Sequence, residues 1–158
     1  MLGMIPLLFP VRVFSIFAHN TNSYFSHGVA SGDPTIDAVI IWTRVTTTIS
    51  GVCNVEWQVA NDAAFKNIVK KGSVTTSQDS DYTVKVDATG LDSNQVYYYR
   101  FIYNETSSDI GVCKTLPVSL LNPLQIAVIS CNNYEDGYFT SFRHIADNPE
   151  IDYVFHLG

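Results

Sequence analysis

Two residues whose side chains could bind a metal or take part in catalysis lie near the end of the sequence. Cys131 follows the apolar run 126–129, and His156 follows the apolar run 153–155. A thiolate is a soft, anionic ligand for transition metals, and an imidazole can bind a metal or orient a neighbouring ligand. From the pattern alone a lone cysteine is more often a buried thiol, and this histidine could simply be packed. Both alternatives stay open from the residues alone.

The surrounding pattern predicts the elements that would position these side chains. Residues 124–129 are predicted to form a strand, and their apolar run 126–129 has no alternation, which is typical of a strand covered on both faces. Apolar residues then recur at helical spacing over 138–146, after acidic residues and a glycine at 135–137 that suit a helix start. A strand–helix–strand unit of this length predicts parallel strands. Ligands bind beyond the carboxyl ends of such strands, so Cys131 and Gly158 mark the predicted site.

Residues 25–118 have an all-β pattern. Predicted strands cover 38–45, 52–60, 82–86, 96–103 and 110–115, and residues 61–71 are predicted to form a loop with a short turn or an edge strand. Short strands at this spacing indicate a fibronectin III- or immunoglobulin-like β-sandwich. Trp42 and Trp57 are predicted core residues. Tyr97, at the start of the penultimate strand, is predicted to form a tyrosine corner.

The chain has three cysteines and no C-x-x-C motif. A bridge between Cys53 and Cys113 is conceivable, but the fibronectin-like strand order places the strand 96–103 between them. Two strand spacings separate the cysteines by roughly 10 Å, whereas a disulfide needs Cα atoms within about 7 Å. We therefore expect no disulfide between these two residues.

Residues 1–24 form an apolar N-terminus that we interpret as a possible signal peptide followed by a linker. The run is interrupted by Arg12 and contains no twin-arginine pair; it is too short and interrupted to span a membrane stably. Export to the periplasm or the extracellular space is expected. The alternatives are an apolar tail or an incorrectly assigned start codon.

The charge balance argues against one class of partner. The sequence contains nine lysines and arginines and fifteen acidic residues, which gives a net charge of −6. A protein that binds along a nucleic acid needs a basic face to neutralise phosphates, so we expect no nucleic-acid partner. The sequence leaves the oligomeric state open.

Several segments together resemble the alkaline phosphatase D (PhoD-like phosphatase and phosphodiesterase) family. They are the G-V-A-S-G-D-P run and the strand ending W-T-R within 25–45, the S-C pair at 130–131, G-Y-F at 137–139 and H-L-G at 156–158. The resemblance implies a mainly β fold: a fibronectin/immunoglobulin-like sandwich, residues 25–118, followed by the first βαβ unit of a truncated α/β metallophosphoesterase domain, residues 124–158.

The resemblance also implies a chemistry. In the family the cysteine matching Cys131 binds a catalytic iron, calcium ions complete the site, and phosphate monoesters and diesters are cleaved. The family continues H-L-G with D-Y-x-Y/H-E, which lies beyond Gly158. We therefore expect these residues alone to be inactive and not to hold the metals stably, with no catalytic residue assigned and Cys131 as the one metal ligand. The alternative function is a stand-alone fibronectin-like binding or adhesion module.

Overall fold

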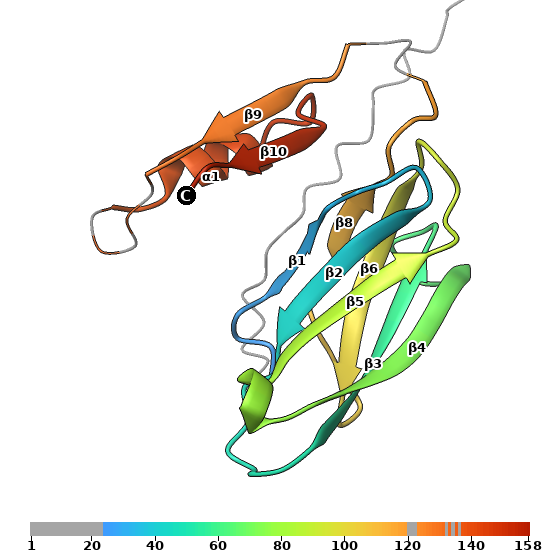
Figure 1. The fold of residues 1–158 in the computed structure, drawn as a ribbon, viewed down its shortest axis with the longest axis vertical. Coiled ribbons are helices and arrows are strands. Elements are labelled where there is room, and N and C mark those ends of the chain that lie inside the picture. Colours follow the sequence, from blue (N-terminus) through green and yellow to red (C-terminus); the bar gives the residue numbers. More distant parts are fainter. Residues whose placement is uncertain (1–23, 120–122, 132, 134, 136) are drawn as a thin grey trace, which may run out of the picture.

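A computed structural model of the chain describes residues 24–158 except 120–122, 132, 134 and 136. The possible signal peptide lies outside the described residues. The structure has two parts, which we call the sandwich, residues 24–118, and the C-terminal unit, residues 123–158 (Figure 1). In the described residues no helix has the length and apolar character needed to cross a membrane.

The smaller sheet of the sandwich is antiparallel, in the order β1-β2-β5. It consists of β1 (Val29–Gly32), β2 (Ala38–Arg44) and β5 (Thr83–Thr89). β2 and β5 lie where their alternating apolar residues predict strands. β1 was not predicted, because its sequence Val-Ala-Ser-Gly contains one β-branched residue and no alternation.

The larger sheet is also antiparallel, and β6 lies at its centre. Its strands are β3 (Cys53–Ala60), β4 (Ile68–Thr76), β6 (Val96–Tyr103), β7 (Thr106–Ser107) and β8 (Gly111–Lys114). β3 pairs with β4 and β6, while β7 and β8 both pair with β6. A single 3-10 turn, η1 (Gln78–Ser80), precedes β5. Residues 61–67 form a loop with a turn at Asp62–Phe65, and the edge strand β4 follows from Ile68 and extends to Thr76.

The inward faces of the two sheets form one hydrophobic core. Tyr97, Tyr99 and Phe101 of β6 are almost fully buried, as their alternation predicts. Burial of one such ring contributes about 1.5–3 kcal/mol. Trp57 is partly buried and packs against this core.

The prediction that Trp42 belongs to the core is wrong. The buried residues of β2 are Val39, Ile41 and Thr43, so Trp42 lies on the opposite, half-buried face. Thr43 can be buried because its hydroxyl donates a hydrogen bond to the Gly28 carbonyl at 2.8 Å. A satisfied hydroxyl costs little on burial, so the alternation alone does not decide which face of β2 points inward.

Two predictions about the larger sheet are confirmed. The backbone N–H of Asp92 donates to the Tyr97 hydroxyl at 2.8 Å, which is the hydrogen bond of a tyrosine corner. β6 lies between β3 and β8, and Cys53 and Cys113 are both buried, unbridged thiols.

The C-terminal unit contains β9 (Ile126–Ile129), α1 (Thr140–Ala146) and β10 (Tyr153–His156). β9 and β10 are parallel, as predicted, and α1 lies across the pair (Figure 1). The helix begins later than its apolar pattern suggested. Phe139 precedes it with a left-handed φ of 50°, and Tyr138 is 97% exposed.

The expectation that the first of these strands is covered on both faces is wrong for the described residues. Ile126 is 46% exposed and Val128 is 63% exposed, and neighbouring Phe155 of β10 is 59% exposed. The helix α1 covers one face of the pair, so the apolar side chains of the other face have no layer against them in the described part of the chain.

Candidate active-site edge

The carboxyl ends of β9 and β10 meet at one edge of the C-terminal unit. The strands pair in register from Tyr153 opposite Ile126 to His156 opposite Ile129. Beyond this ladder, the Cys131 N–H donates to the Gly158 carbonyl at 2.7 Å. The two residues predicted to mark the site are therefore adjacent.

The local backbone turns at Cys131. Its φ is 56°, a left-handed conformation that is uncommon for a residue other than glycine. Its side chain is exposed and its thiol is unbridged. An accessible thiol at a strand end can act as a metal ligand once it loses its proton. The buried-thiol alternative, which the residues alone left open, does not apply to Cys131.

His156 is held by two contacts beside this edge. Its ring stacks on Phe142 of α1, with centroids 6.0 Å apart and planes 5° from parallel. Its Nδ1 accepts a hydrogen bond from the Gly158 N–H at 3.0 Å, so the ring proton of neutral His156 is on Nε2. The Gly158 carbonyl in turn accepts a hydrogen bond from the Cys131 N–H. His156 therefore stabilises, through Gly158, the strand end that contacts Cys131.

The other two cysteines lie in the sandwich core and have a different chemistry. The Cys53 thiol donates to the Tyr103 hydroxyl at 3.4 Å. Burial raises the pKa of the Cys113 thiol to about 12. These thiols are structural residues.

The described edge offers a metal one suitable donor atom, the Cys131 sulfur. Cys131 supplies one soft, anionic donor, which fits a transition metal such as iron. No group of three or more histidine, cysteine or acidic side chains is close enough to hold an ion among the described residues. Cys131 therefore fits as one ligand of a metal site.

A cleft of about 1100 Å³ separates the C-terminal unit from the sandwich. The sandwich contributes Val96 and Val112 to its lining, and the C-terminal unit contributes Ile126, Ile145 and Phe155. Cys131 does not line it. His156 lines the cleft as well, so this largely apolar feature adjoins the candidate site.

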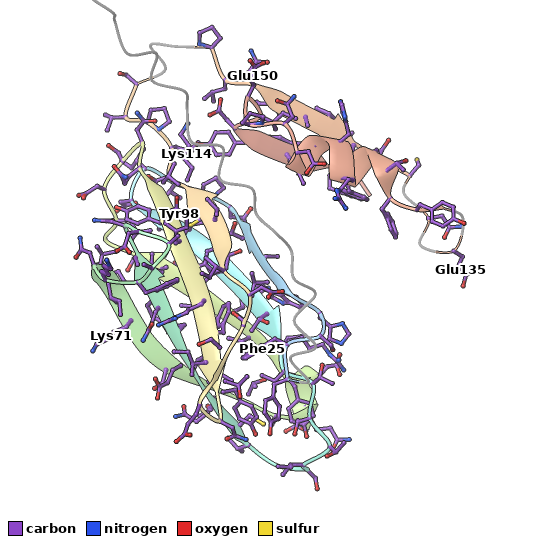
Figure 2. All side chains as sticks on the ribbon, turned by 180° about the vertical axis from the view of Figure 1, so that it is seen from behind. Phe25, Lys71, Tyr98, Lys114, Glu135 and Glu150 are labelled. Atoms are coloured by element: carbon purple, nitrogen blue, oxygen red, sulfur yellow. The ribbon has the colours of Figure 1, made fainter. Side chains whose placement is uncertain are left out.

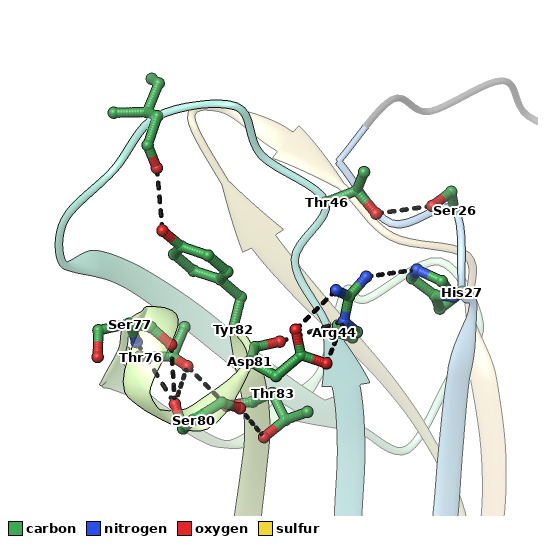
Figure 3. A network of polar contacts seen from close by, with 11 residues as sticks. Ser26, His27, Arg44, Thr46, Thr76, Ser77, Ser80, Asp81, Tyr82 and Thr83 are labelled. Atoms are coloured by element: carbon green, nitrogen blue, oxygen red, sulfur yellow. Dashed lines mark hydrogen bonds and ion pairs between the residues drawn. The ribbon is translucent and has the colours of Figure 1, made fainter.

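A polar network at the opposite end of the sandwich was not found by sequence reasoning (Figure 3). The Arg44 guanidinium donates to both carboxylate oxygens of Asp81, at 2.8 and 3.0 Å, and its Nη1 lies 2.6 Å from His27 Nε2. The hydrogen bond from Arg44 lowers the pKa of the Asp81 carboxyl group. These residues are far apart in sequence, and no spacing signal links them. The network ties the segment before β1 to the ends of β2 and β5.

Comparison with known proteins identifies the two parts of the chain. Residues 13–117 match the family described as "PhoD-like phosphatase, N-terminal domain", and residues 126–158 match the family described as "PhoD-like phosphatase". The chain is 42% identical to alkaline phosphatase D of Bacillus subtilis over 151 residues, which cover 89% of this chain and 26% of that protein. It therefore spans about a quarter of the length of this curated relative.

Solved structures agree with this assignment. The structure of PhoD superposes with a TM-score of 0.80 at 40% identity, covering 87% of this chain and 28% of that one. A cycloisomaltooligosaccharide glucanotransferase of Paenibacillus sp. superposes with a TM-score of 0.50 at 13% identity, covering 82% of this chain and 20% of that one. The second similarity concerns the fold alone.

Proposed function

The chain belongs to the PhoD-like phosphatase family, and from this premise we propose that it forms the N-terminal sandwich and the first βαβ unit of a metal-dependent phosphatase acting on phosphate monoesters and diesters. The observation that supports this most directly is the exposed Cys131 thiol at the carboxyl edge of the parallel pair. The two family matches together extend across both parts, so a stand-alone binding module is not favoured.

In this proposal Cys131 is a ligand to iron, with calcium ions completing the site. When bound, these cations would lower the pKa of a coordinated water and neutralise phosphoryl oxygens. The chain's own contribution is to hold the thiol. The Cys131 N–H is fixed on Gly158, and Gly158 is fixed on His156. This arrangement holds the main chain at Cys131 before any ligand binds.

A chimera tests the proposed function. In this chimera, the residues of the present chain replace the matching segment of Bacillus subtilis alkaline phosphatase D. With iron and calcium supplied, we expect hydrolysis of p-nitrophenyl phosphate. Cys131→Ala should lower activity by about 100-fold or more, since loss of even a supporting residue around a metal costs up to about 100-fold. His144→Ala, on the exposed side of α1, is the matched control and should retain activity.

Iron content, measured on the purified chimera, is the second readout. Loss of iron together with activity in the Cys131→Ala variant supports the ligand role. A folded Cys131→Ala chimera that keeps both iron and full activity would refute it.

We further propose that a polypeptide of these 158 residues alone is inactive and that the protein is exported. One thiolate supplies one metal ligand, whereas phosphoryl transfer requires several charges placed around the phosphate. Turnover of p-nitrophenyl phosphate with iron and calcium should not exceed that of a Cys131→Ala control.

Export is tested by fusing residues 1–24 to a reporter that is active only outside the cytoplasm.

A further inference from the structure

The two parts of the chain are joined by side chains at one corner. Lys114, at the end of β8, faces the C-terminal unit (Figure 2). Its Nζ donates to Oδ1 of Asp152 at 2.6 Å, and the two side chains are 30% and 22% exposed. Solvent and salt screen a partly buried ion pair less than a fully exposed one, and a fully exposed pair contributes little to stability.

Asp152 connects more than two segments. Its Oδ2 accepts the Gln125 N–H at 3.1 Å, and its own N–H donates to the Gln125 carbonyl at 2.9 Å. Gln125 directly precedes β9 and Asp152 directly precedes β10. One carboxylate therefore fixes the starts of both parallel strands to each other and to the last strand of the sandwich.

A second contact lies beside the first. The Tyr153 hydroxyl donates to the Thr115 carbonyl at 3.3 Å. Thr115 is fully buried, and its hydroxyl donates to the Asp92 carbonyl at 2.7 Å, so the acceptor belongs to the rigid part of the sandwich. Two adjacent contacts limit rotation about either one of them.

We propose that Lys114 and Asp152 are positioning residues that set the orientation of the β9–β10 pair, and therefore of the carboxyl edge bearing Cys131, relative to the sandwich. This inference rests on the proposed function in one respect: the edge matters because it would bear the metal site. The strands are short, so a rotation at their starts moves their carboxyl ends with them. The pair Lys114–Asp152 acts on the site through the strands and does not touch it.

A distance measurement on the full chain tests the proposal. In a Cys131→Ser background, spin labels are attached at Lys71→Cys on β4 and His144→Cys on α1, both exposed positions. Pulsed electron resonance then gives the distribution of distances between the parts. We expect a narrow distribution in the parent. Lys114→Met and Asp152→Asn should each broaden it roughly two-fold or more, because the hydrogen bond from Tyr153 to Thr115 alone does not limit rotation about itself.

Two control variants separate the ion pair from general effects. Lys114→Arg keeps the charge and should keep the distribution narrow. Arg143→Met removes the Arg143–Asp147 ion pair, which lies within α1 and joins no two parts, and should also leave it narrow. The proposal is overturned if Lys114→Met matches the parent, or if either control broadens the distribution as much as Lys114→Met does.

Acidification provides an independent readout. The hydrogen bond from Lys114 lowers the pKa of Asp152, and the phenol of Tyr153 is the other titratable group beside it. The docked arrangement is therefore present above the ordinary carboxyl range and is lost as the pH falls through the lowered pKa. The parent should broaden on acidification, while Asp152→Asn should be broad at every pH. A parent distribution that stays narrow after Asp152 is protonated would overturn the proposal.

The measurement distinguishes this inference from the proposed function. Its readout is a distance and needs neither metal nor turnover. Near-ultraviolet circular dichroism verifies that the sandwich remains folded in each variant. An inactive chimera with a narrow distribution refutes the proposed function alone, whereas an active chimera whose distribution is unaffected by Lys114→Met refutes the positioning role alone.

Discussion

The three cysteine thiols lie in different environments, and their reactivity should differ accordingly. Cys131 is exposed, whereas Cys53 and Cys113 are buried and burial raises the pKa of Cys113 to about 12. The thiolate is the reactive form. At mildly alkaline pH we expect one thiol per native chain to react quickly with iodoacetamide, and Cys131→Ser should remove this fast phase.

The same labelling in urea should modify all three cysteines without prior reduction, because the structure contains no disulfide between Cys53 and Cys113. Mass spectrometry of the labelled peptides identifies the sites. A second fast thiol in the native chain would contradict the described burial.

The ion pair of Arg44 with Asp81 predicts a pH dependence of stability. The pKa of Asp81 is lowered in the folded chain, chiefly by the hydrogen bond from Arg44. Over the acidic range the unfolded chain binds more protons, so this stabilisation is complete at neutral pH and is lost as pH falls through the lowered pKa. Asp81→Asn should therefore unfold at a lower urea concentration than the parent at pH 7, and the difference should vanish in acid.

Asp109→Asn is the matched control, because the Asp109 side chain forms no hydrogen bond or ion pair among the residues that the structure describes. Asparagine also tolerates the left-handed φ of 51° found at Asp81, so backbone strain does not explain a loss. An equal difference at pH 7 and in acid would show that the Arg44 pair is not responsible.

Some residue-level features followed from the sequence and others could not. The absence of a Cys53–Cys113 bridge follows from strand order and a distance limit. The contact of His27 with Arg44 does not, because it depends on how the segment before β1 crosses the end of the sheet. Side chains brought together by three separate segments leave no periodic signal in the sequence.

At the level of secondary structure, Gly111 of β8 occupies a position where the larger sheet has no space. A methyl group there would collide with the ring of Tyr99, which is 2% exposed. Inserting a methyl group into a packed core typically costs 1–3 kcal/mol, so we expect Gly111→Ala to lower the free energy of unfolding by about 1–3 kcal/mol. Urea denaturation measures this loss.

Gly32→Ala in β1 is the control for that substitution. A methyl group at Gly32 meets nothing within 4 Å, and the residue is exposed at the end of its strand. It should change stability by only a few tenths of a kcal/mol. A similar loss in both variants would indicate a general cost of replacing strand glycines.

The strand whose buried face the sequence predicted most directly is β3. It carries apolar residues at every second position with polar residues between most of them, and the structure buries the apolar face. β2 also alternates, but both of its faces carry apolar residues, so the sequence could not decide between Ile41 and Trp42 for the core. The choice depends on the hydrogen bond that satisfies Thr43, which is a tertiary contact.

At the level of the whole molecule, the sandwich and the C-terminal unit should differ in resistance to proteolysis. The hydrophobic core cluster is formed entirely by sandwich residues, and α1 contains no buried residue. Val118, at the start of the connection, is 76% exposed. We expect subtilisin to cut first within 118–123 and to leave a resistant sandwich fragment, identified by intact-mass measurement.

A chain that resists cleavage there while being cut within the sandwich would contradict this two-part organisation. Such local differences in stability reflect how many apolar contacts each unit makes. The sequence indicated the boundary, because the alternating pattern ends and prolines follow. The sequence could not predict how the two units are oriented, since the orientation depends on contacts such as that between Lys114 and Asp152.

The β9–β10 ladder also restricts how related sequences can vary in length. Its four residue pairs give the ladder a length of about 13 Å, at roughly 3.3 Å per residue, between the anchored starts of the strands and the edge that bears Cys131. A one-residue deletion inside the ladder would turn Cys131 to the opposite face of the sheet. Insertions and deletions among homologues should therefore accumulate in the connection before β9 and be rare within 126–131.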